Sequence, residues 1–127
     1  MIAVDTSSLV AFFQGELSID VEAIERSISE ETLIVPPFVV TEIFSAKNLS
    51  TEAKLVVDSL PTRTLDVSFW KRSGLLRLKL LKLGLKARSI DSLIAQFCLD
   101  NKLTLICGDR DFRHLSEHTG LNLLIES

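Results

Sequence analysis

Four acidic residues of this chain stand where they could hold a metal ion: Asp5, Glu42, Asp91 and Asp109. Four carboxylates that meet in space repel one another unless a divalent cation neutralises them, and carboxylate oxygens select Mg²⁺ or Mn²⁺ over zinc. One or two such ions can lower the pKa of water, orient a phosphodiester and stabilise the charge that develops on its oxygens. If the four side chains converge, we expect a site for phosphoryl chemistry.

Two of these acids each follow a short apolar run that predicts a strand. Asp5 comes directly after Ile2–Val4, and Asp109 follows the run at residues 103–107 after one glycine. The carboxyl ends of parallel strands form the edge where such sheets bind ligands. Taken singly, each aspartate is equally well explained as a helix N-cap.

The other two acids are expected on helices. Glu42 is embedded among Phe38, Val39, Val40, Ile43 and Phe44. An unpaired buried charge is costly, so this glutamate needs a cation or a protonation change, with a Lys or Arg partner as the alternative. Asp91 falls in the first turn of a helix that Ser89 can cap, where an acid that favours the helix dipole is the alternative.

The elements that must position these acids follow from apolar runs that alternate with segments of helical period. Strands are expected at Ile2–Val4, 33–35, 103–107 and 121–125. Helices are expected at about 6–14, 21–29, 38–47, 51–60, 66–83, from 89 onward, and from Asp109 or Asp111 to about 115. This alternation predicts an α/β fold with a central parallel sheet flanked by helices.

Signals at the helix ends refine these boundaries. Capping residues are expected in the segment Thr6-Ser7-Ser8, at Asp20, at Ser50 or Thr51, and at Ser89, and Gly84 is expected to end the helix at 66–83. That helix has an apolar stripe of Phe69, Leu76, Leu80 and Leu83.

Positive charge is concentrated in one segment of an otherwise acidic chain. The net charge is −3, yet no acid lies between Val67 and Ile90, where half of the 14 basic residues fall: Lys71, Arg72, Arg77, Lys79, Lys82, Lys86 and Arg88. Lysine and arginine contact phosphates without regard to sequence, so we expect a basic face that steers a polyanion. Arg88 is the first candidate for a phosphate contact, with Lys86 and Lys82 beside it; plain surface solvation is the alternative.

Length and composition predict a single domain over residues 1–127, because 127 residues with 46% hydrophobic content suffice for one core. No run is long and apolar enough for a membrane span, and the N-terminal residues do not resemble a secretory signal, so we expect a cytoplasmic protein. Cys98 and Cys107 form neither a disulfide framework nor a zinc pattern, and His114 and His118 have no evident third ligand.

At these residues the sequence resembles the PIN-domain ribonucleases and, within them, the VapC-type toxins of bacterial and archaeal toxin–antitoxin pairs. Four segments carry the resemblance, at residues 2–9, 39–43, 89–95 and 105–112, and each contains one of the four acids. Each segment is a weak signal by itself. Four of them in order along the whole chain make a specific one.

The resemblance implies a PIN-like domain with Asp5, Glu42, Asp91 and Asp109 as metal-binding acids and Asp111 as a further acid nearby. It implies Mg²⁺- or Mn²⁺-dependent cleavage of single-stranded RNA that leaves a 5′-phosphate, homodimerisation, and inhibition by an antitoxin whose C-terminal segment fills the groove. Thr6 or Ser7 would help to orient Asp5 or a water on the metal. Cys107 departs from the family pattern, which has Thr or Ser there, and a thiol is a poor hydroxyl substitute.

Three alternatives remain at this stage. A phosphoaspartate protein, either a receiver domain or a haloacid-dehalogenase-like phosphatase, also places Asp after the first strand, but Ser7 stands where the phosphatase needs a second Asp. A non-catalytic PIN-like binding module normally lacks one or more acids. A housekeeping RNA-processing nuclease would share the acids and differ from a toxin only in its biological role.

Overall fold

The computed structural model describes residues 1–124, which form three short parallel strands and seven helices. The strands are β1 (Ile2–Val4), β2 (Leu33–Ile34) and β3 (Thr104–Ile106), in the order β2-β1-β3. Ala3 pairs with Ile34 on one side and with Leu105 on the other. The strand that immediately precedes Asp5 is therefore the centre of the sheet.

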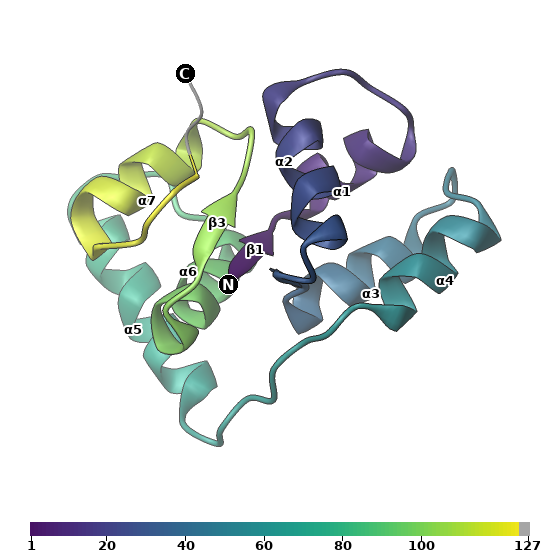
Figure 1. Ribbon diagram of the computed structural model, residues 1–127. Coiled ribbons are helices and arrows are strands. Elements are labelled where there is room, and N and C mark those ends of the chain that lie inside the picture. The colour runs from purple at the N-terminus through teal and green to yellow at the C-terminus, as the bar shows by residue number, and fades with distance from the viewer. Residues whose placement is uncertain (125–127) are drawn as a thin grey trace.

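Helices surround this small sheet, which confirms the predicted α/β class. They are α1 (Thr6–Phe13), α2 (Ile19–Ser29), α3 (Pro37–Ser45), α4 (Thr51–Ser59), α5 (Phe69–Lys82), α6 (Ser89–Asn101) and α7 (Asp111–Thr119). Figure 1 shows α3 and α4 together on one side of the molecule and α5 and α7 on the other, with the strands between them. α5 packs along α6, α1 along α2, and α2 contacts both β2 and β3.

Aromatic side chains join three helices into one core. Phe38 of α3 stacks on Phe69 of α5 with ring centroids 5.6 Å apart, and meets Phe97 of α6 edge-on at 6.4 Å. Phe69 and Phe97 are fully buried, as are the central residues of β1 and β3. This packing fixes α3 and α6, the helices that carry Glu42 and Asp91, relative to each other.

Several helices begin at residues other than the expected ones. Asp5 itself caps α1, accepting a hydrogen bond from the Ser8 backbone N–H, so the predicted cap at Thr6-Ser7-Ser8 is wrong by one residue. Ser18 replaces Asp20 as the cap of α2, whereas Ser50 caps α4 as expected. Ser89 lies inside the first turn of α6, which has no side-chain cap. Ser and Asp are comparable caps, so local geometry decides among neighbours.

The strand expected at 121–125 is wrong for the residues that the structure describes there. Between residues 121 and 124 only a single bridge forms, from Leu123 to Leu105, with hydrogen bonds from Leu105 N to the Asn122 carbonyl and from Leu124 N to the Leu105 carbonyl. Residue 125 of the expected strand lies outside the described residues. The apolar run predicted a strand here, but residues 121–124 and β3 are joined only at this single bridge.

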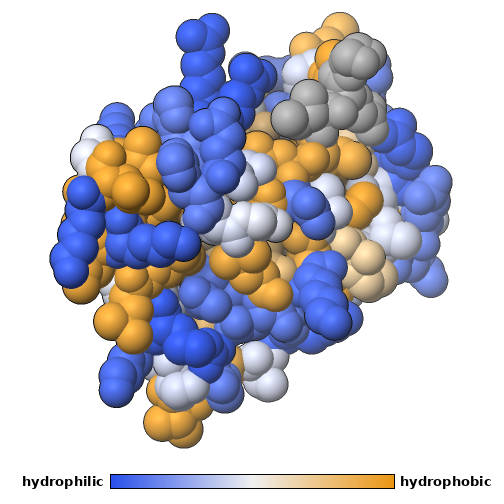
Figure 2. All heavy atoms as spheres, turned by 90° about the vertical axis from the view of Figure 1, so that its left-hand side faces the viewer, coloured by the Kyte–Doolittle hydropathy of each residue, from blue (hydrophilic) through white to orange (hydrophobic). Residues whose placement is uncertain are grey.

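The outer side of α5 is mixed rather than purely basic. Leu75, Leu78 and Leu83 line a groove there together with Lys79 and Lys82. Leu83 is half exposed, not buried as expected, because it is the C-cap residue, just before Gly84 turns the chain with a φ of +77°. Figure 2, which views the α5 and α7 side, shows hydrophobic side chains between hydrophilic ones. Within residues 1–124, no helix is long and apolar enough to span a bilayer.

Candidate active site

The four predicted acids line a single pocket of about 300 Å³ at the carboxyl ends of β1 and β3. We call it the acid pocket; its wall consists of Asp5, Thr6, Ser7, Glu42, Arg88, Ile90, Asp91, Ile94, Asp109 and Phe112. Sheet topology accounts for Asp5 and Asp109, because neighbouring parallel strands end at the same edge. α3 and α6 bring Glu42 and Asp91 to that edge from outside the sheet.

Asp5 is held rigidly at the floor of the acid pocket. Its Oδ1 accepts from the Ser8 backbone N–H at 2.9 Å and its Oδ2 accepts from the Ser7 hydroxyl at 3.2 Å. The residue is only 4% exposed, and burial raises the pKa of its carboxyl, although the hydrogen bonds from Ser8 and Ser7 oppose that shift. Capping and a role in the site are thus compatible, because one oxygen serves the helix end.

Glu42 lies opposite the start of α1 and is half-buried. Its Oε1 accepts a hydrogen bond from the Thr6 hydroxyl at 2.5 Å. The expectation that Glu42 is enclosed by apolar neighbours is wrong, because its face of α3 opens on the pocket and Phe44 is itself exposed. Among residues 1–124 no Lys or Arg forms an ion pair with it, so the alternative of a structural cationic partner has no support there.

Asp91 is the most deeply enclosed acid on a helix. It is 4% exposed in the first turn of α6, and burial raises the pKa of its carboxyl, an effect that the neighbouring Arg88 guanidinium opposes. Arg88 contacts both of its oxygens, with Nε 2.9 Å from Oδ2 and Nη2 3.3 Å from Oδ1. This aspartate therefore faces the pocket and not solvent.

Asp109 completes the acid pocket on the β3 side, and Asp111 lies beside it. Asp109 Oδ1 accepts from the Asp111 backbone N–H at 2.9 Å, and its Oδ2 lies 3.1 Å from Arg88 Nη2. Asp111 lies 3.6 Å from Lys86 Nζ. One carboxylate oxygen from each of Asp91, Asp109 and Asp111 lies within 4.8 Å of the others. Asp111 thus stands close to two of the four acids, Asp91 and Asp109.

The donor set fits a hard divalent cation. The groups that converge are carboxylate oxygens with hydroxyls behind two of them, which suits Mg²⁺ or Mn²⁺ better than zinc. No Cys or His lines the acid pocket, and both histidines are exposed on α7. Burial raises the pKa of the Cys107 thiol, which keeps it protonated and a poor metal ligand.

The two hydroxyl residues after β1, Thr6 and Ser7, contact different acids. Ser7 contacts Asp5, as one form of the expectation had it, whereas Thr6 contacts Glu42 instead. Cys107 forms no hydrogen bond with Asp109 that would replace a hydroxyl donor; the support comes from the Asp111 N–H and from Arg88. The departure from the family pattern therefore leaves Asp109 with two donors.

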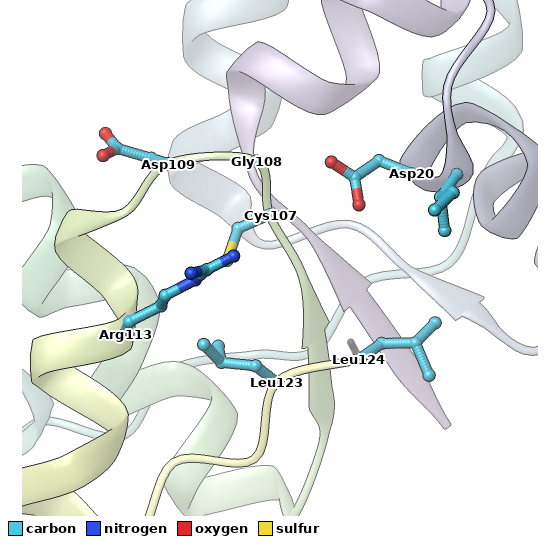
Figure 3. Close-up of a pocket in the computed structure, with 8 residues that line it drawn as sticks. Asp20, Cys107, Gly108, Asp109, Arg113, Leu123 and Leu124 are labelled. Carbon is cyan, nitrogen blue, oxygen red and sulfur yellow. The ribbon is translucent and has the colours of Figure 1, made fainter. Parts of the chain in front are cut away.

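A second cavity of about 220 Å³ adjoins the acid pocket on the other side of Asp109. Figure 3 shows Arg113 extending from α7 toward Cys107 and Asp20 approaching Gly108 from the side of α2. Sequence reasoning missed both residues, and Arg113 had a signal: it follows Asp109 by one helical turn. A Cβ on Gly108 would lie 3.0 Å from Asp20 Oδ2, so a larger residue there would require the Asp20 side chain to shift.

The three basic residues expected to contact RNA lie in different settings. Arg88 lines the acid pocket, and Lys86 is exposed and paired with Asp111. Lys82 lies in the groove on α5 and does not line the pocket. Two other cations of the basic segment are engaged elsewhere: Arg72 pairs with Asp66 and Asp100, and Arg77 donates to the Ala87 carbonyl.

Neutralising Asp5 should stabilise the metal-free protein at neutral pH. Burial raises its folded-state pKa above 3.8, so the folded protein binds this proton more readily than the unfolded chain. The contribution of Asp5 to stability therefore falls as pH rises through the window above 3.8 and stays lost at neutral pH. Asn keeps the capping oxygen. We expect the free energy of unfolding of Asp5→Asn to exceed that of wild type by more than about 0.5 kcal/mol, which is the usual limit for the effect of a surface substitution.

Urea unfolding in the presence of a chelator, from acid to neutral pH, measures this difference. Asp58→Asn on the exposed side of α4 is the control and should show no such pH-dependent gain. A gain for Asp5→Asn that is the same at all pH values would show that the carboxyl charge is not its origin.

Comparison with known proteins agrees with this fold. The PIN domain family matches residues 2–118, so the chain belongs to the PIN domain family. Its fold is similar to that of a chain in the crystal structure of VapBC2 from Rickettsia felis bound to a DNA fragment from their promoter, with a TM-score of 0.75, 20% identity and 100% of both chains covered. A search of the curated proteins found no match. PIN domains are generally nucleases, and membership excludes the receiver and phosphatase alternatives.

Proposed function

We propose that this protein is a Mg²⁺-dependent endoribonuclease that hydrolyses single-stranded RNA, and that it is the toxin of a VapBC-type toxin–antitoxin pair. The observation that carries the proposal is the convergence of Asp5, Glu42, Asp91 and Asp109 on one pocket. Four carboxylates that line one small pocket repel one another, and a bound divalent cation would offset this cost.

Asp5, Glu42, Asp91 and Asp109 would hold one or two cations. When bound, the metal supplies a Lewis acid that polarises the phosphodiester and favours the hydroxide form of the attacking water. The chain's own groups prepare the place: Ser7 and Thr6 fix the orientations of Asp5 and Glu42, and Ile94 and Phe112 form an apolar wall that limits water. Hydrolysis adds water across a P–O bond, leaving a 5′-phosphate on one fragment and a hydroxyl on the other.

The toxin assignment and the partners are supported by fewer observations than the nuclease activity is. The fold is similar over its full length to a chain of VapBC2, which supports an antitoxin partner, and the sequence resemblance supports a homodimer and a cytoplasmic location. A housekeeping RNA-processing nuclease is the second candidate, since it would use the same pocket. A non-catalytic PIN-like module is less well supported, because such a module has no use for four converging acids.

The test is cleavage by the purified protein. We expect single-stranded RNA to be cut when Mg²⁺ or Mn²⁺ is present, to be left whole in a chelator, and to give fragments with 5′-phosphates; the matching duplex should be cut far more slowly. Cleavage that continues in a chelator would exclude the metal mechanism. Binding of RNA without cleavage under every metal condition would favour the non-catalytic module.

A further inference from the structure

Arg88 lies across the acid pocket and bridges two of its acids. Its Nε is 2.9 Å from Asp91 Oδ2, and its Nη2 is 3.3 Å from Asp91 Oδ1 and 3.1 Å from Asp109 Oδ2. One guanidinium therefore contacts three carboxylate oxygens from two parts of the chain, the start of α6 and the segment after β3. These contacts with Asp91 and Asp109 explain the position of Arg88 without a phosphate contact.

The oxygens that Arg88 contacts belong to the group best placed to hold a cation. Asp91 and Asp109, with Asp111, are the acids whose oxygens lie within 4.8 Å of one another. A carboxylate oxygen that coordinates Mg²⁺ does so at about 2.0–2.1 Å, much closer than it lies to a guanidinium nitrogen. A guanidinium and a divalent ion also repel each other. The bridge and a cation on the same oxygens therefore exclude each other.

Arg88 is free to turn away, whereas Asp91 is enclosed. Its side chain is 55% exposed, whereas that of Asp91 is 5% exposed. Arg88 precedes α6 with an extended backbone at φ −69° and ψ 151°, so a change of side-chain rotamer does not disturb the helix. Turning outward would move the guanidinium away from Asp91 and Asp109 to the rim of the acid pocket, where a phosphate group could meet it.

We propose that Arg88 is a tethered counterion that competes with the divalent cation for Asp91 and Asp109. It neutralises the acids when the protein holds no metal, and it turns outward when a cation binds. The released guanidinium then stands beside the metal as a donor for the RNA backbone. This inference rests on the proposed metal site and adds that cation binding must first break the Arg88 bridge.

Competition differs from a general effect of nearby charge, and Lys86 provides the comparison. Lys86 Nζ lies 3.6 Å from Asp111 Oδ2, so it is also a cation beside the same cluster, but it bridges no two acids and is 73% exposed. Removing either residue changes the local charge equally. Only the removal of Arg88 removes the hydrogen bonds that a cation has to break.

The test measures Mn²⁺ binding by calorimetry in the absence of RNA. We expect Arg88→Ala to bind Mn²⁺ more tightly than wild type by about tenfold, the size expected when charge-assisted hydrogen bonds no longer have to break. Lys86→Ala should change the affinity by much less. Arg88→Lys keeps the charge but lacks the planar fork, and it should lie between wild type and Arg88→Ala. Without metal, Arg88→Ala should also unfold at a lower temperature than wild type. Adding Mn²⁺ should raise its unfolding midpoint by more than it raises that of wild type.

The wild-type protein gives a second measurement that needs no variant. In protein labelled with ¹⁵N-arginine, the Arg88 Nε–H signal should shift when Mg²⁺ is added, at the cation concentrations that produce heat in calorimetry. Equal gains in affinity for Arg88→Ala and Lys86→Ala, or an Arg88 signal unchanged at saturating Mg²⁺, would overturn the competition and leave the metal site standing. Absence of cation binding in every variant would overturn the proposed function itself.

Discussion

Substituting Asp91 by Asn is expected to abolish Mg²⁺-dependent cleavage of single-stranded RNA while the fold is retained. Asp91 is enclosed, lines the acid pocket with the other three acids and is contacted there by Arg88. The amide is a weaker and uncharged ligand. We expect a loss of about a thousandfold or more, equivalent to about 4 kcal/mol of transition-state stabilisation, which is within what a catalytic metal supplies.

The fold should survive because Asn has the same shape and still accepts a hydrogen bond from Arg88. Burial already raises the pKa of the Asp91 carboxyl, so a neutral group is tolerated at this position. Circular dichroism and thermal unfolding check the fold, and RNA cleavage under single-turnover conditions checks the rate. Asp58→Asn, on the exposed side of α4, should cleave like wild type. Cleavage by Asp91→Asn at the wild-type rate would exclude a role for Asp91 in catalysis.

Replacing Phe97 by Ala is expected to destabilise the protein by about 3–5 kcal/mol, the range for truncating a large buried aromatic side chain. Phe97 is fully buried in α6 and meets Phe38 of α3 edge-on. Its removal leaves a cavity between the two helices that carry Asp91 and Glu42. A loss of this size is a large part of the about 5–15 kcal/mol by which domains are stable.

Urea unfolding and the midpoint of thermal unfolding measure this loss, and we expect the midpoint to fall by about 10–20 °C for a domain of this size. Phe44→Ala is the matched control, because Phe44 lies on α3 but is 45% exposed. It should cost less than about 1 kcal/mol. If the two variants were equally stable, the aromatic core could not be what fixes α3 against α6.

The sequence was informative about the site where a simple rule of sheet geometry applied. Asp5 and Asp109 each follow a predicted strand, and parallel strands bring their carboxyl ends to one edge, so the meeting of these two residues could be expected from spacing alone. Glu42 and Asp91 had no such rule, and their arrival at the same pocket was implied by the family resemblance. That the four acids bind metal stays a prediction.

Other features could not be predicted because they depend on competition among neighbours. Asp5, Thr6, Ser7 and Ser8 are all able to cap a helix, and only the direction of the chain leaving β1 selects Asp5. Arg88 stood out in the sequence as a phosphate contact. Its bridge between Asp91 and Asp109 depends on two loops meeting in three dimensions, which no local pattern encodes.

The central position of β1 in the sheet has a consequence for when the acid pocket can form. β1 lies between β2 and β3, and β3 is the last of these three strands along the chain. Domains gain contacts between distant segments only when both have emerged. Asp5 therefore stays apart from Asp91 and Asp109 until α6 and β3 have been made, and a chain that ends before α6 lacks two of the four acids of the pocket.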